Sequence, residues 1–122
     1  MREKRRLKIT VYYNLPVYKQ SYDLLLDIFK LTKDFSREYK YTIGEELKKE
    51  IVAMVINIYR ANGTSYRVKY ISAAKENMEV IRLLVRLVRD LQQIKISRIA
   101  KISSKIEELS KQLTAWGNYS KK

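Results

Sequence analysis

Apolar residues recur at spacings of three and four through most of this sequence, and that period is the strongest constraint on its fold. The pattern is cleanest near the C-terminus, where it forms one narrow stripe: Ile99, Ile102, Ile106, Leu109, Leu113 and Trp116. Residues spaced in this way lie along one face of an α-helix. Since the chain has only one proline and three glycines, helix breakers are few, and the sequence predicts an all-α protein.

Four helices are expected, joined by short connectors. They cover approximately residues 14–35, 42–61, 66–95 and 98–117. An asparagine and a proline at the start of the first segment suit a helix N-terminus. A Thr-x-x-Glu sequence at the start of the second predicts a capping box. Because short connectors place sequential helices side by side, the pattern predicts an up-down-up-down four-helix bundle.

The sequence divides into three parts. Residues 1–14 form a basic N-terminal arm in which apolar and polar residues alternate, and this predicts a short strand or an extended segment. Residues 15–119 form the bundle, and residues 120–122 form a short basic tail. A chain of 122 residues with 46% hydrophobic content is long enough to pack one core. We therefore expect a single domain with two basic ends.

The segment from residue 79 to residue 95 is too apolar for a helix with one buried face. Its apolar side chains sweep about 200° of the helix surface, roughly twice the arc of an ordinary surface helix. One buried direction is the core of the bundle, and a neighbouring subunit would supply the other. We therefore predict a closed homo-oligomer. The residues predicted to form its interface are Ile81, Leu84, Val85 and Val88.

Arg82, Arg86 and Arg89 occupy the narrow strip that the apolar residues leave free, with Lys75 in line. One interpretation is a solvated face on which these cations pair with acidic neighbours at helical spacings. Another is that the strip lines an oligomer pore or a subunit seam, where symmetry would repeat each arginine. Arginine also suits phosphate groups and interface carboxylates. The residues alone leave these alternatives open.

The charge balance predicts a polyanionic partner, most commonly nucleic acid. Lys and Arg number 26 against 13 Asp and Glu, which gives a net charge of +13. The candidate binding residues are Lys75, Arg82, Arg86, Arg89, Arg98, Lys101 and Lys105, with Arg2, Lys4, Arg5, Arg6 and Lys8 in the arm. Tyr12, Tyr13 and Tyr119 lie beside the basic ends and are candidates for stacking on bases.

Catalytic chemistry is not indicated. The chain has no cysteine and no histidine, so it offers neither a nucleophile–histidine pair nor the usual zinc ligands. No glycine-rich phosphate loop is present, and we expect no enzyme activity, metal or cofactor. The absence of cysteine favours a reducing compartment. With neither a signal peptide nor an apolar run long enough for a membrane span, we expect a cytoplasmic protein that contacts no membrane.

Several segments of the sequence resemble one known family. They are LPVYKQSYDLLLDIFKLTKDF (15–35), FSREYKYTIGEEL (35–47), NIYRAN (57–62), ISAAKENMEVIRLLVRLVRDLQ (71–92) and IEELSKQLTAWGNY (106–119). The first three are similar to the four-helix-bundle proteins of ribosomal-RNA intervening sequences and retroelements. The last two resemble the accessory variability determinant protein of diversity-generating retroelements, which ends in a Gly/Ala-Trp element.

This resemblance implies a specific function. It predicts a homopentameric, positively charged barrel that binds the reverse transcriptase of the element and its RNA or DNA template, and supports mutagenic copying without catalysing it. Two alternatives remain at this point. One is a ribosomal-RNA intervening-sequence protein, and the other is a helical adaptor for an acidic protein partner. The basic arm has no counterpart in the family pattern.

Overall fold

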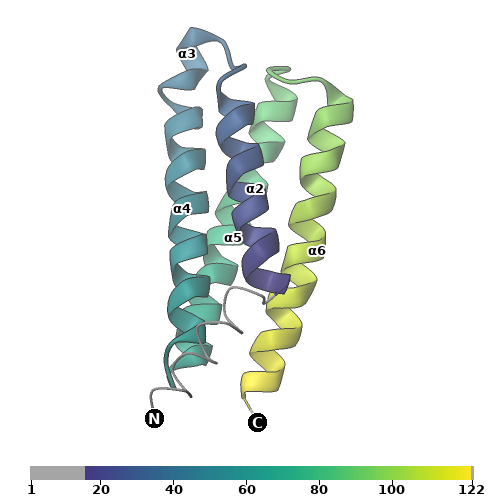
Figure 1. Cartoon of the computed structure of the whole chain (residues 1–122). Helices are drawn as coiled ribbons and strands as arrows, with labels where there is room; N and C mark the ends of the chain where they lie inside the picture. The colour runs from purple at the N-terminus through teal and green to yellow at the C-terminus, as the bar shows by residue number, and fades with distance from the viewer. Residues whose placement is uncertain (1–15, 122) are drawn as a thin grey trace.

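The computed structural model describes residues 16–121, which form four long helices and one short helix (Figure 1). The elements are α2 (Pro16–Thr32), α3 (Arg37–Lys40), α4 (Ile43–Asn62), α5 (Arg67–Asp90) and α6 (Ile96–Ser120). The all-α prediction is confirmed for this part of the chain, in which no strand occurs. The predicted basic arm and its strand lie outside the described residues.

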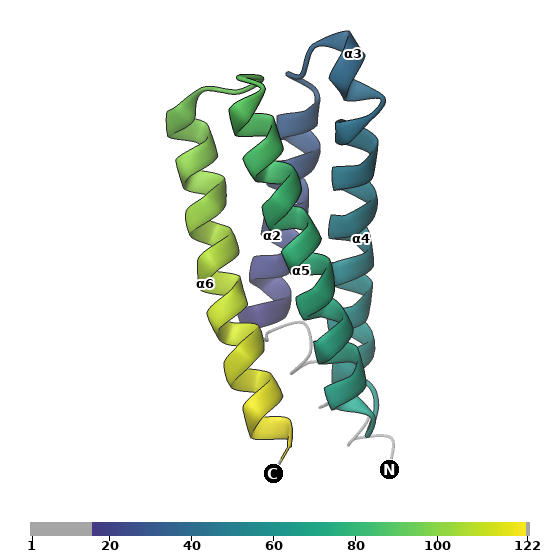
Figure 2. The ribbon, with the colours of Figure 1, turned by 180° about the vertical axis from the view of Figure 1, so that it is seen from behind.

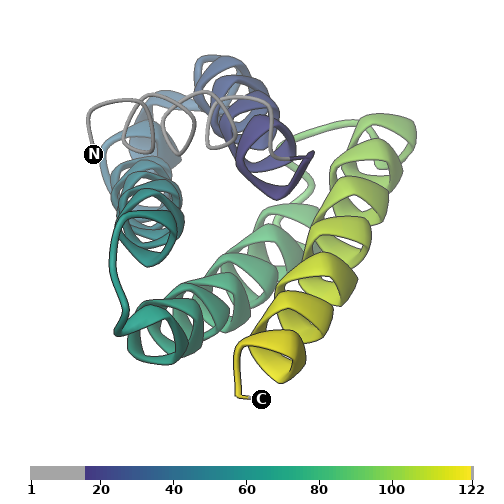
Figure 3. The same ribbon diagram turned by 60° about the horizontal axis from the view of Figure 1, so that its bottom comes forward.

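The four long helices run alternately up and down, as the short connectors predict. Each helix packs against the next one in the chain, and α6 returns beside α2 to close the bundle. The view toward one end of the bundle shows this square arrangement, with α2 and α5 on one diagonal and α4 and α6 on the other (Figure 3). The bundle therefore has four grooves, one between each pair of adjacent helices.

One stripe of each long helix fills the core. Its largest fully buried side chains are Leu24, Ile28, Leu31, Leu47, Ile51, Met54, Ile58, Ile71, Met78, Ile81, Ile106 and Leu109. On each helix these positions follow spacings of three and four, which brings them onto the face that meets the other helices. Because burying such a side chain is worth about 1.5–3 kcal/mol, this shared apolar seam is the main source of stability.

The structure corrects the predicted subunit interface. Ile81, Val85 and Val88 are buried in the bundle's own core, and Leu84 packs against that core. They face inward because they continue the three-and-four spacing of Ile71 on the same helix. Ile81, Val85 and Val88 are therefore occupied within one chain, whereas Leu84 is only partly buried and its predicted interface role stays a prediction.

The second apolar side of α5 does exist, but it consists of other residues. Val80, Leu83 and Leu87 remain exposed, on the side of the helix away from the buried stripe. The apolar arc of α5 therefore has a buried part and an exposed part. The residues of the exposed part differ from those predicted to form the outer surface.

The predicted capping box is not formed. The Thr42 hydroxyl makes no N-cap hydrogen bond and instead donates to the carbonyl oxygen of Glu38 at 3.1 Å. The physical reason is α3, a single helical turn that ends at Lys40 and brings the Glu38 carbonyl within reach of the Thr42 side chain. The Thr42 carbonyl oxygen still accepts a hydrogen bond from the amide of Glu46 at 3.1 Å, as the first turn of α4 requires.

The third helix ends earlier than the prediction of residue 95, because the chain turns at Gln92. This residue has a φ of 54°, in the left-handed region that glycine usually occupies at helix ends. Its amide donates to the carbonyl oxygen of Arg89 at 3.0 Å, and the amide of Gln93 donates to that of Val88 at 3.2 Å. The two bonds form a Schellman motif that ends α5 at Asp90.

We predict that Gln92→Gly stabilises the protein. A side chain at a left-handed position costs about 1–2 kcal/mol, whereas glycine adopts it freely but loses about 0.5–1 kcal/mol in chain entropy. The free energy of unfolding, measured by urea denaturation, should rise by about 0.5–1 kcal/mol. As a control, Ala100→Gly on the exposed side of α6 should lower it by about 1 kcal/mol. An equal loss in both variants would contradict the role of the turn.

Candidate nucleic-acid interface

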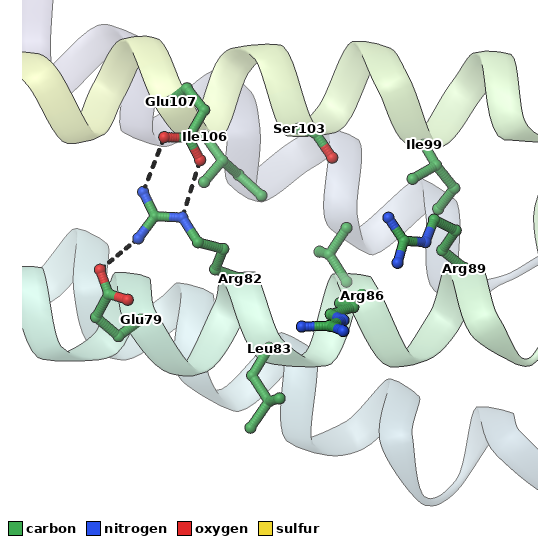
Figure 4. Close-up of a pocket in the computed structure, with 10 residues that line it drawn as sticks. Glu79, Arg82, Leu83, Arg86, Arg89, Ile99, Ser103, Ile106 and Glu107 are labelled. Atoms are coloured by element: carbon green, nitrogen blue, oxygen red, sulfur yellow. Dashed lines mark hydrogen bonds and ion pairs between the residues drawn. The ribbon is translucent and has the colours of Figure 1, made fainter.

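Three of the predicted arginines lie along the groove between α5 and α6 (Figure 4; Figure 2 shows the two helices from outside). The groove has a volume of about 460 Å³. It is lined by Glu79, Arg82, Leu83, Val85, Arg86, Arg89, Ile99, Ser103, Ile106 and Glu107. The periodicity of α5 places Arg82, Arg86 and Arg89 one above another at the groove edge, as predicted.

Arg82 is fully engaged with carboxylates. Its Nε donates to Glu107 Oε2 at 2.8 Å and its Nη2 donates to Oε1 of the same residue at 3.1 Å. A third contact joins its Nη1 to Glu79. The hydrogen bonds that Arg82 donates to Glu107 are the largest cause of its raised pKa, burial opposes this effect, and Glu79 adds to it. Arg82 therefore acts as a bidentate clamp between α5 and α6.

The positive charges of Arg86 and Arg89 are compensated much less, because the two arginines share one carboxylate, that of Asp90. Arg89 Nη2 lies 3.1 Å from Asp90 Oδ1, whereas Arg86 Nε lies 4.0 Å from Oδ2 of the same carboxylate. The side chains of Arg86 and Arg89 are 71% and 48% exposed, respectively. A second anionic group can therefore approach both guanidinium groups. Of the three arginines in the strip, these two have charge available for a ligand.

The other predicted cations on α6 face a different groove. Arg98 pairs with Asp34 of the connector after α2 at 2.5 Å, and Lys105 pairs with Asp27 on α2. The groove between α2 and α6 has a volume of about 580 Å³ and also contains Lys101. The structure therefore divides the predicted basic set between the two sides of α6.

Sequence reasoning missed one cation of this second groove. Lys30 of α2 lines it together with Lys101, and its position one helical turn after Asp27 was the available signal. Lys75 is exposed but does not line the α5–α6 groove. The remaining candidates, Arg2, Lys4, Arg5, Arg6 and Lys8, lie outside the described residues.

Two further observations concern the chemistry of residues 16–121. Within this range, no three His, Cys, Asp or Glu side chains are grouped so that they could hold a metal ion. Nor does any helix of the same range have the length and apolar character needed to cross a membrane. The fold and the grooves thus define a class: a basic four-helix bundle whose charged residues line the grooves between helices.

Comparison with known families identifies the family within this class. A family model described as bAvd-like matches residues 15–120. The chain belongs to this family, the accessory variability determinants of diversity-generating retroelements, and the resemblance seen in the sequence is confirmed. The family consists of non-catalytic accessory proteins. Among curated proteins, none matches the chain.

We predict that the Arg82–Glu107 clamp is a structural contact. In a double-mutant cycle with Arg82→Gln and Glu107→Gln, the coupling in unfolding free energy should be about 0.5–1 kcal/mol, the upper range for a partly exposed ion pair. Urea denaturation of the four proteins measures it. A cycle with Arg86→Gln and Glu107→Gln is the matched control and should show no coupling. A coupling near zero in both cycles would rule out the clamp.

Proposed function

We propose that this protein binds the reverse transcriptase and the template nucleic acid of a diversity-generating retroelement and holds them together as a ring of identical subunits. The observation that carries the proposal is the incompletely compensated positive charge of the α5–α6 groove, where Arg86 and Arg89 share one carboxylate. On a chain of net charge +13, these two guanidinium groups can bind phosphates. Membership of the bAvd-like family supports the retroelement context.

The proposed binding mode is mainly electrostatic. Contacts from arginine and lysine to phosphates fix the position of a nucleic acid without reading its sequence, because the backbone is the same for every base. Such contacts release counterions, so affinity should fall steeply with salt concentration. A scaffold of this kind accepts any template that the element supplies. Copying would then belong to the polymerase, and this chain would raise the local concentration of its template.

The ring is supported by two separate apolar faces on diagonal helices. One is on α2 and consists of Tyr22, Leu26 and Phe29, and the other is on α5 and consists of Val80, Leu83 and Leu87. Exposed apolar groups of this size are typical of contact surfaces. A contact between two different faces is heterologous, and its repetition gives a ring when the rotation between neighbouring subunits closes on itself. Five subunits is the number that the family resemblance implies.

We predict that two complementary variants distinguish a ring from a symmetric dimer. Leu83→Glu should disable the α5 face and Leu26→Glu the α2 face, because a charge would be buried in each contact. Each variant alone should be monomeric by multi-angle light scattering. Mixed together, they retain one intact contact and should form a one-to-one heterodimer.

The matched control is Ile96→Glu, which changes an exposed apolar residue outside both faces and should leave the ring intact. A monomeric mass for the unaltered protein would refute the ring. Failure of the two variants to associate would show instead that the α2 and α5 faces do not meet.

We further predict that Arg86→Gln with Arg89→Gln weakens binding to single-stranded RNA. Loss of two phosphate contacts should reduce the slope of log affinity against log salt by about 1.4, at about 0.7 per contact. Fluorescence anisotropy at several salt concentrations measures the slope. The matched control is Arg37→Gln with Lys49→Gln, which removes the same charge from exposed positions away from the groove.

The same two double variants should be tested for capture of the reverse transcriptase of the element. If the groove pair and the control pair reduce RNA binding equally, net charge alone is responsible and the groove is not the binding site. If neither changes the salt slope, the nucleic-acid part of the proposal is wrong. Circular dichroism should show unchanged helicity in both.

A further inference from the structure

The two ends of the bundle differ in composition. At one end, the α4–α5 connector and the last turns of α6 come together, and α2 begins nearby (Figures 1 and 3). No aspartate or glutamate occurs between residues 51 and 75, or between residues 109 and 121. The opposite end, by contrast, contains Asp34, Glu38 and Asp90. We refer to the first as the acid-free end.

Basic residues are frequent at the acid-free end. Arg60, Arg67, Lys69 and Lys121 lie on its helices and their connector, and none of them has an acidic partner among the described residues. Positive charge at this end is therefore uncompensated, in contrast to the ion pairs along the grooves.

Aromatic side chains accompany these cations. Tyr66 is 73% exposed directly before α5, and Tyr119 is 72% exposed in the last turn of α6. At the same end, the guanidinium carbon of Arg67 lies 5.9 Å from the ring centroid of Trp116. This arginine also donates through Nε to the Ala61 carbonyl oxygen at 3.2 Å. The Arg67 contacts thus hold the α4–α5 connector and the end of α6 in a fixed relation.

We propose that the acid-free end is a binding site for unpaired bases of a single-stranded nucleic acid. Tyr66 and Tyr119 stack on bases, and Arg60, Lys69 and Lys121 neutralise the flanking phosphates. Aromatic rings among cations are the usual elements of single-strand binding, because every base has a π-face. Duplex nucleic acid lacks accessible base faces and would not use the two tyrosines. This site is separate from the α5–α6 groove and does not depend on Arg86 or Arg89.

The alternative is that these tyrosines are ordinary surface residues and that only the charge matters. The test therefore compares a short fluorescein-labelled oligothymidine with an abasic strand of equal length, which has the same phosphates but no bases. The unaltered protein should bind the oligothymidine more tightly. Tyr66→Ala with Tyr119→Ala should lower affinity for the oligothymidine about tenfold per tyrosine, with affinity for the abasic strand and the salt slope unchanged.

Two controls separate stacking from folding. Tyr66→Phe with Tyr119→Phe retains the rings and should retain binding. Tyr41→Ala removes an equally exposed tyrosine (67%) at the opposite end and should have no effect. Trp116 is the only tryptophan of the chain, so its emission reports on this end directly. It should change when the oligothymidine binds and not when the abasic strand does.

The outcomes distinguish this proposal from the proposed function. Equal affinity of the unaltered protein for both strands, or an equal effect of Tyr41→Ala, overturns the base-stacking site and leaves the arginine groove standing. An effect of the tyrosine pair without an effect of Arg86→Gln and Arg89→Gln supports the stacking site and rejects the groove. Failure of the unaltered protein to bind either strand overturns both.

Discussion

The apolar seam shared by α2, α4, α5 and α6 is the constraint on which the rest of the structure depends. It occupies one stripe of each helix, so all other contacts lie in the four grooves between helices. These grooves differ in chemistry. A lysine lies over a phenylalanine ring between α2 and α4, and an amide pair joins α4 to α5. Arg82–Glu107 joins α5 to α6, Lys105–Asp27 joins α6 to α2, and Arg98–Asp34 joins α6 to the connector after α2. Such differences favour one order and register of the helices over others.

The sequence predicted the helices and most of the core, because a three-and-four period can be read from local spacing alone. Its errors lie where the outcome depends on something other than period. Gln92 takes a left-handed turn that sequence reasoning assigns to glycine. The short α3 turn gives the Thr42 hydroxyl a different acceptor. On α5, the apolar arc is so wide that spacing alone does not show which side faces the core. Val85 was therefore predicted at a subunit interface, whereas it is buried in the core.

The candidate site was predicted only in part for a related reason. The alignment of Arg82, Arg86 and Arg89 follows from helix geometry within α5. The pairing of these arginines with carboxylates does not follow from that geometry. Glu107 reaches Arg82 from another helix, so this ion pair depends on how α5 and α6 are aligned. The position of the α6 cations in the α2–α6 groove likewise depends on partners outside α6, namely Asp27 of α2 and Asp34 of the connector after it. In a bundle of this kind, local sequence therefore locates a charged side chain, whereas packing determines whether its charge is free.

This distinction changes the meaning of the net charge. Much of the positive charge in the two grooves that flank α6 is paired with carboxylates, whereas among residues 16–121 the acid-free end has no acidic side chain to offset its cations. If the subunits form the proposed ring through α2 and α5, cyclic symmetry places the same end of every bundle on the same side of the ring. The acid-free ends would then form one continuous rim. A long single strand could contact several subunits at once, and the effective concentration of each further site would rise. Weak stacking at one subunit would in this way become firm binding to the assembly.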